Sequence, residues 1–222
     1  GTKITTDLAK YATIAGVDAL SALPPFYYNF SNEEIYNYYS DIAQSSHLPI
    51  IIYNISHANL MDIDMLKRLA AIDNIKGVKY TAATHFNFDK IKKEIGAYFK
   101  IYSGMDEMAI SGLISGADGM IGSFYNLMPE MFVGIFENMK NGNVVEAKKL
   151  QDKVNMIILY ALKKSGYPFI KMGLSWMGID SGYVRKPFSS IVNTEIEKEI
   201  KDDLKKLISE NDLSEINFLK AL

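Results

Sequence analysis

The chain has 222 residues, of which 48% are hydrophobic and 23% charged, which is ordinary for a globular protein with one large core. Its 24 basic and 26 acidic residues leave a formal net charge of −2, so no strong field attracts nucleic acid or an anionic membrane. The absence of cysteine excludes disulfides, thiolate metal sites and cysteine nucleophiles, and it fits a reducing cytoplasm. No apolar run reaches the roughly 18 residues of a membrane-spanning helix.

Helical and strand-like patterns alternate from the start of the chain. A strand is expected over residues 18–23, and Ser31 then opens a capping box with Glu34, followed by apolar positions at helical spacing. The apolar run over residues 50–53 is short and β-branched, as in a strand that is buried on both faces. Asp62 is expected to cap the next helix.

The same alternation continues beyond the second helix. Strand patterns cover residues 75–81, 99–103 and 117–123, and a short helix over residues 106–115 stops at Gly116. Repeated βα units predict a parallel sheet, either a barrel or doubly wound. Because a (β/α) barrel closes with eight strands and an unclosed sheet leaves unpaired edges, we expect a (β/α)8 TIM barrel that lacks about the first three βα units in this chain.

The last third of the chain has helical patterns only. They cover residues 144–164 and, as a charged amphipathic helix, residues 193–210. We therefore expect a partial (β/α) barrel over residues 1–165 and a C-terminal helical extension of the same domain over residues 166–222.

Lys79 is the most informative candidate for chemistry. Side chains at the carboxyl ends of parallel strands share one rim, and strand alternation places Lys79 on the same face as Thr81 near such an end. An amine that is partly removed from water there loses its preference for the ammonium form and becomes a nucleophile. The alternative is a lysine whose long stem simply reaches solvent, which is the commoner reading of an isolated lysine.

Other polar residues lie near the same strand ends. Tyr53 ends the preceding strand, where a phenol can pass a proton between a substrate and an imine, although it can also close the top of a core. Asp106 and Glu107 stand where a helix is expected to begin, so capping and the helix dipole also explain them. The three histidines show no metal-ligand spacing.

Several segments, taken in order, match the motifs of one known family. They are Pro25-Phe26-Tyr27-Tyr28, Tyr53-Asn54-Ile55, Gly77-Val78-Lys79-Tyr80-Thr81, Gly104-Met105-Asp106-Glu107, Gly119-Met120-Ile121-Gly122-Ser123-Phe124-Tyr125-Asn126 and Arg185-Lys186-Pro187-Phe188. The chain thereby closely resembles the pyruvate-dependent aldolase family of N-acetylneuraminate lyase and dihydrodipicolinate synthase. The similarity extends from Gly1 to about Ser190.

The resemblance implies a homotetrameric barrel without a metal or an organic cofactor. Lys79 would be the Schiff-base lysine, and Tyr53 the proton donor and acceptor. Tyr27 matches a tyrosine that reaches into a neighbouring subunit's site in this family. The implied reaction is the cleavage of N-acetylneuraminate, a sialic acid, into N-acetylmannosamine and pyruvate.

Within the family, the details resemble the sialate lyases. Thr81, Gly104, Asp106, Glu107 and Ser123 match the positions with which those lyases hold the hydroxyl-rich chain of the sugar. Carboxylates and hydroxyls are suitable hydrogen-bond partners for a polyol. Dihydrodipicolinate synthases instead carry an arginine soon after the catalytic tyrosine, and residues 55–59 contain none.

Two departures from the family pattern leave alternatives open. Ser56 and Leu60 stand where the family usually has proline and glycine, and the Gly-Gly-Ser-Thr-Gly-Glu loop that binds the carboxylate of the 2-oxo acid is not found. We therefore expect the chain alone to be incomplete as a catalyst. The alternatives are a pyruvate-dependent aldolase for another aldehyde, such as a dihydrodipicolinate synthase or a 2-keto-3-deoxy sugar acid aldolase, and an inactive paralogue that acts as a binding or scaffold protein.

Overall fold

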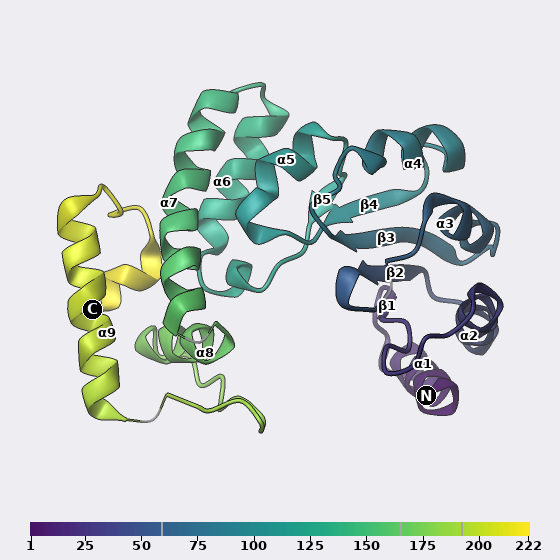
Figure 1. Ribbon diagram of the computed structural model, residues 1–222, viewed down its shortest axis with the longest axis horizontal. Helices are drawn as coiled ribbons and strands as arrows, with labels where there is room; N and C mark the ends of the chain where they lie inside the picture. Colours follow the sequence, from purple (N-terminus) through teal and green to yellow (C-terminus); the bar gives the residue numbers. More distant parts are fainter. Residues whose placement is uncertain (59, 165, 192) are drawn as a thin grey trace. The chain divides into compact units, whose positions relative to one another are not determined.

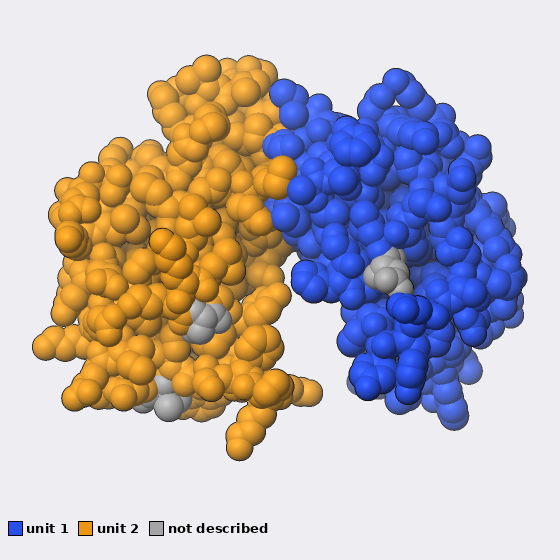
Figure 2. Space-filling model, viewed as in Figure 1, with its two compact units in different colours: residues 1–105, 111–121 blue, residues 106–110, 122–222 orange. Residues whose placement is uncertain are grey.

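A computed structural model of the protein describes residues 1–58, 60–164, 166–191 and 193–222 (Figure 1). Residue 165, where the partial barrel is expected to end, and residue 59, in the stretch without arginine, lie outside the described residues. The chain forms two compact units, which Figure 2 colours separately. Unit 1 comprises residues 1–105 and 111–121, and unit 2 comprises residues 106–110 and 122–222. No helix among the described residues is long and apolar enough to cross a bilayer.

Unit 1 is built on a parallel sheet whose strand order follows the sequence, β1-β2-β3-β4-β5 (Figure 1). The strands are β1 (Leu20–Ala22), β2 (Ile50–Ile55), β3 (Ile75–Thr81), β4 (Lys100–Ser103) and β5 (Gly119–Met120). All neighbouring pairs are parallel. A doubly wound sheet reverses its strand order at a switch point, whereas this order continues in one direction, as it does in a barrel.

Helices precede or connect these strands. They are α1 (Thr2–Ala15), α2 (Asn32–Ser45), α3 (Ile63–Ala70) and α4 (Asn87–Ile95), and each packs against the next. Ser31 and Glu34 form the predicted capping box at the start of α2. Asp62 accepts a hydrogen bond from the Met65 N–H group and so caps α3, as predicted.

The two faces of the sheet differ in burial. Ile52 and Val78 are fully buried in the core, together with helix residues such as Leu66. Tyr53 and Lys79, which alternate with them along the two strands, are only half-buried on the opposite face. The half-buried face therefore keeps polar side chains accessible, while the helix-covered face supplies the hydrophobic stabilisation of unit 1.

The expected helix over residues 106–115 has a different form. It consists of a 3₁₀ turn, η2 (Asp106–Met108), followed by the short helix α5 (Ala109–Ile114). The Gln151 side chain accounts for the break, because it hydrogen-bonds both the Asp106 carbonyl and the Ile110 N–H group, the two groups that an α-helix would join directly.

Unit 2 is helical. Its main helices are α6 (Pro129–Lys140), α7 (Val144–Lys164), α8 (Tyr167–Trp176) and α9 (Thr194–Glu210), with 3₁₀ turns η3 (Phe124–Asn126) and η4 (Asn217–Ala221). The helices predicted over residues 144–164 and 193–210 are confirmed, and Asn193 caps the second of them. The Tyr160 hydroxyl of α7 donates a hydrogen bond to the Asp203 carboxylate of α9 at 2.8 Å, and this bond connects the two helices.

Candidate active site

The centre of the candidate site is a lysine beside a tyrosine on neighbouring strands. Lys79 of β3 lies opposite Tyr53 of β2 in the parallel register. The Lys79 Nζ atom is 4.1 Å from the centroid of the Tyr53 ring. A cation above an aromatic face is attracted by the ring quadrupole, so this contact holds the amine over the phenol ring.

Gly104 and Thr81 complete this cluster in unit 1. A Cβ atom at position 104 would lie 2.0 Å from Thr81 Oγ1 and 3.2 Å from Lys79 Cε, so the absence of a side chain makes room for both. Among the described residues, buried Thr81 Oγ1 has no hydrogen-bond partner. Because an unsatisfied buried hydroxyl is costly, Thr81 is ready to bond a ligand at this position.

Tyr102 belongs to the same row of residues, and the sequence reasoning missed it. Tyr102 is a residue of β4 that lies between Lys79 of β3 and Gly119 of β5 in the parallel register. Its side chain is half-buried. A Cβ atom at Gly119 would lie 3.2 Å from the Tyr102 ring. The side-chain alternation that places Lys79 on one face of β3 also applies to β4. Applied there, it would have identified Tyr102 as a residue of the same face.

Asp106 and Glu107 lie in unit 2, on the η2 turn. Asp106 is buried, and its carboxylate accepts a hydrogen bond from the Phe124 N–H group at 2.7 Å. The Asp106 side chain therefore binds the first residue of η3. This differs from the prediction, in which Asp106 caps the helix that begins at its own position. A Cβ atom at Gly122 would lie 1.9 Å from Asp106 Oδ1, so only glycine fits there without rearrangement. Glu107 and Ser123 are exposed.

Tyr125, in the same unit, is a polar group that the sequence reasoning did not select. Its ring is 3.8 Å from that of Phe132, and among the described residues its buried hydroxyl has no hydrogen-bond partner. Burial, and then the charges of Asp106 and Glu107, raise the pKa of Tyr125. The phenol therefore stays protonated at neutral pH and remains a hydrogen-bond donor.

Tyr27 is not part of the Lys79 cluster. Its side chain is 81% exposed and packs edge-on against Tyr28, with ring centroids 4.8 Å apart. Among the described residues, no group of three or more histidine or carboxylate side chains is placed to hold a metal ion. The chemistry on the half-buried face of the sheet is that of an amine, phenols and a hydroxyl.

Comparison with known proteins gives these residues a family context. Residues 1–210 match the Dihydrodipicolinate synthetase family. The chain is 34% identical over 200 residues to N-acetylneuraminate lyase of Rhizobium meliloti (strain 1021), covering 88% of this chain and 67% of that one. The structure resembles CdNal from Clostridium difficile, crystallised in complex with mannosamine, with a TM-score of 0.88 and 35% identity over 93% of this chain and 71% of the other.

A third relative has a similar sequence identity and a similar fold. N-acetylneuraminate lyase from Fusobacterium nucleatum has a TM-score of 0.83 and 35% identity, covering 91% of this chain and 71% of that one. These likenesses confirm the predicted TIM-barrel type of fold, to which the described residues contribute five parallel strands.

Proposed function

The chain belongs to the dihydrodipicolinate synthetase family of Schiff-base aldolases and lyases, and we propose that it cleaves N-acetylneuraminate into N-acetylmannosamine and pyruvate. The observation that carries the proposal is the Lys79 amine, 4.1 Å from the centre of the Tyr53 ring on the neighbouring strand. Its relatives named as N-acetylneuraminate lyases support the choice of substrate.

In the proposed reaction, the Lys79 amine attacks C2 of the open-chain sugar acid and loses water to form an imine. The imine withdraws electrons while Tyr53 takes the proton from the C4 hydroxyl, so that the C3–C4 bond breaks. N-acetylmannosamine leaves with an aldehyde at the former C4, and the electron pair stays on C3 as an enamine. Protonation at C3 and hydrolysis of the imine then release pyruvate and restore the Lys79 amine.

We further propose that the hydroxyl-rich chain of the sugar is bound by the residues that match the sialate lyases. In unit 1 these are Thr81, whose hydroxyl has no partner among the described residues, and Gly104, which keeps the space beside it open. In unit 2 they are Asp106, Glu107 and Ser123, two carboxylates and a hydroxyl that suit a polyol.

We also propose a homotetramer in the cytoplasm, with Tyr27 completing a neighbouring subunit's site. The exposed aromatic side chains of Phe26, Tyr27 and Tyr28 support an interface, since apolar surface of this kind is usually covered. The division into a partial barrel, residues 1–165, and a helical extension, residues 166–222, likewise stays a prediction.

A product assay tests the choice of substrate. The protein is incubated with N-acetylneuraminate, and N-acetylmannosamine and pyruvate are measured over time, with a Lys79→Arg variant as the control. Equal amounts of both products, and none from the variant, are expected. In the reverse direction, pyruvate is offered with N-acetylmannosamine, a sugar-acid-derived aldehyde and aspartate semialdehyde. Faster condensation with one of the last two would replace the sialate assignment by the alternative aldolase.

A further inference from the structure

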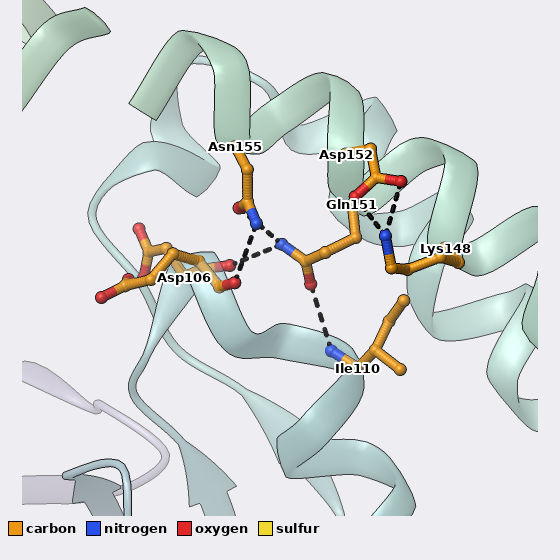
Figure 3. A network of polar contacts seen from close by, with 7 residues as sticks. Asp106, Ile110, Lys148, Gln151, Asp152 and Asn155 are labelled. Atoms are coloured by element: carbon orange, nitrogen blue, oxygen red, sulfur yellow. Dashed lines mark hydrogen bonds and ion pairs between the residues drawn. The ribbon is translucent and has the colours of Figure 1, made fainter. Parts of the chain in front are cut away.

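The η2 turn that carries Asp106 and Glu107 is held by a side chain far away in the sequence. Gln151 of α7 donates from Nε2 to the Asp106 carbonyl at 3.1 Å, and its Oε1 atom accepts from the Ile110 N–H group at 3.2 Å (Figure 3). The Gln151 side chain is 5% exposed, so water competes little for these bonds. The amide therefore occupies the place of one backbone hydrogen bond and stabilises the turn in its 3₁₀ form.

Asn155, one helical turn further along α7, adds hydrogen bonds to the same network. It lies four residues after Gln151 on α7, and its Oδ1 atom accepts the second Nε2 proton of Gln151 at 2.9 Å (Figure 3). Its Nδ2 group donates to the Glu107 carbonyl at 3.1 Å. Each of the two carboxylate-bearing residues thus has its own main-chain carbonyl fixed by one amide of the same rigid helix.

This arrangement differs from ordinary helix packing. Contact between α7 and the turn could be made by apolar side chains alone, but here one donor and the acceptor of Gln151 are used on polar main-chain groups of the turn, and its second donor is used on the Asn155 side chain. The Asp106 carboxylate is in turn bonded to the Phe124 N–H group, so main chain and side chain of this residue are both constrained. Groups that must meet several hydroxyls at once need such constraint, since small misplacements lose bonds.

We propose that Gln151 and Asn155 are positioning residues, which set the geometry of the η2 turn and thereby present the carboxylates of Asp106 and Glu107 to a hydroxyl-rich ligand. The inference rests on the proposed function, because it takes the sugar chain as that ligand. Neither amide acts on the reacting atoms. Their effect is on sugar affinity and not on imine formation at Lys79.

The test compares Gln151→Met, which keeps the side-chain length without the hydrogen bonds, and Asn155→Ala with the unsubstituted protein. Lys148→Ala is the matched control, because Lys148 lies on the same helix and pairs with exposed Asp152 (Figure 3). Amide hydrogen exchange at Ile110 reports on the turn, titration with N-acetylmannosamine reports on sugar binding, and borohydride reduction with pyruvate reports on Lys79.

We expect Gln151→Met to speed exchange at Ile110 and to weaken N-acetylmannosamine binding about tenfold, as fits the loss of buried hydrogen bonds. Pyruvate labelling of Lys79 and all properties of Lys148→Ala should stay unchanged. If Gln151→Met does not fold, the same titration of Asn155→Ala with N-acetylmannosamine tests the inference, and weaker binding is again expected.

Sugar affinity that is unchanged in both variants overturns the inference, and so does an unsubstituted protein that does not bind N-acetylmannosamine. A lack of Lys79 labelling in the unsubstituted protein contradicts the proposed function instead. The exchange and sugar-binding measurements then still decide the role of the two amides.

Discussion

Tyr53 has two parts with separable roles. Its ring lies beneath the Lys79 amine, whereas its hydroxyl is the group that can carry a proton. Removal of the hydroxyl alone therefore distinguishes placement of the amine from proton transfer.

A Tyr53→Phe variant should keep the amine in place but lose the base. We expect the rate of N-acetylneuraminate cleavage to fall roughly 100- to 10,000-fold, as for loss of a general base, while the free energy of unfolding changes by about 0.5 kcal/mol or less. Steady-state kinetics and urea unfolding measure the two effects. Tyr36→Phe is the matched control, since Arg68 lies over the Tyr36 ring at 3.9 Å. Full cleavage activity in Tyr53→Phe would remove the proton-transfer role.

Among individual residues, the sequence predicts those whose role depends on their position in a strand. Lys79 and Tyr53 could be selected because both lie near the ends of strands that the pattern predicts, although β2 continues two residues beyond Tyr53, to Ile55. Gln151 could not, because its bond to Asp106 joins residues 45 positions apart, and no local pattern pairs them. Tyr125 stands within a family motif, but its buried hydroxyl becomes evident only in three dimensions.

Among the elements, Asp118 shows how the loop before β5 is fixed to its neighbours. Its carboxylate accepts hydrogen bonds from Lys92 of α4 at 2.5 Å, from the Ile101 N–H group of β4 at 2.8 Å and from Lys100 at 3.2 Å. Burial raises the pKa of Asp118, but the bonds from Lys92, Ile101 and Lys100 outweigh burial and hold it below its ordinary value.

An Asp118→Asn variant should reduce the free energy of unfolding by about 1–3 kcal/mol at pH 7. Because the folded-state pKa is lowered, the ionised carboxylate stabilises the fold above the pKa of the unfolded chain, about 3.9, and this contribution is lost as the pH falls through the folded-state value. Urea unfolding from pH 7 to pH 3 measures the difference, which should shrink toward acid. Exposed Asp89→Asn, which removes a pair with Lys93, is the control. A pH-independent difference would contradict this assignment.

Sequence patterns located elements well where end signals were strong. The capping box at Ser31 and the N-cap at Asp62 both mark real helix starts. No helix is predicted over α1, which has no side-chain cap and no acidic residue in its first turn. No helix is predicted over α6 either, although Pro129 at its first turn is a usable start signal. The 106–115 helix was predicted as one piece because the Gln151 amide that divides it comes from another element.

For the whole molecule, alternating patterns establish a parallel α/β fold but do not separate a barrel from a doubly wound sheet. The strand order, which never reverses, and the likeness to N-acetylneuraminate lyases identify the barrel type. Local patterns cannot supply this, because strand order depends on contacts between distant segments. The chain spans 67–71% of the length of the relatives compared above.

The proposed assembly can be tested through the exposed aromatic segment. Light scattering should give the mass of four chains, and Phe26→Ser should shift the protein toward smaller species, because Phe26 is 65% exposed in the single chain. Tyr27→Phe should keep the assembly and lower the cleavage rate. A monomeric parent protein, or a Phe26→Ser variant of unchanged mass, would argue against this interface.

The most direct measurement of the central claim is chemical trapping of the imine. The protein is incubated with pyruvate and borohydride, digested, and searched by mass spectrometry for lysine that carries a 1-carboxyethyl group. We expect one modified residue, Lys79, with Lys76 of the same strand unmodified although it is exposed. Modification of Lys76 or other lysines in place of Lys79, or no modification at all, would contradict the assignment of Lys79 as the Schiff-base residue.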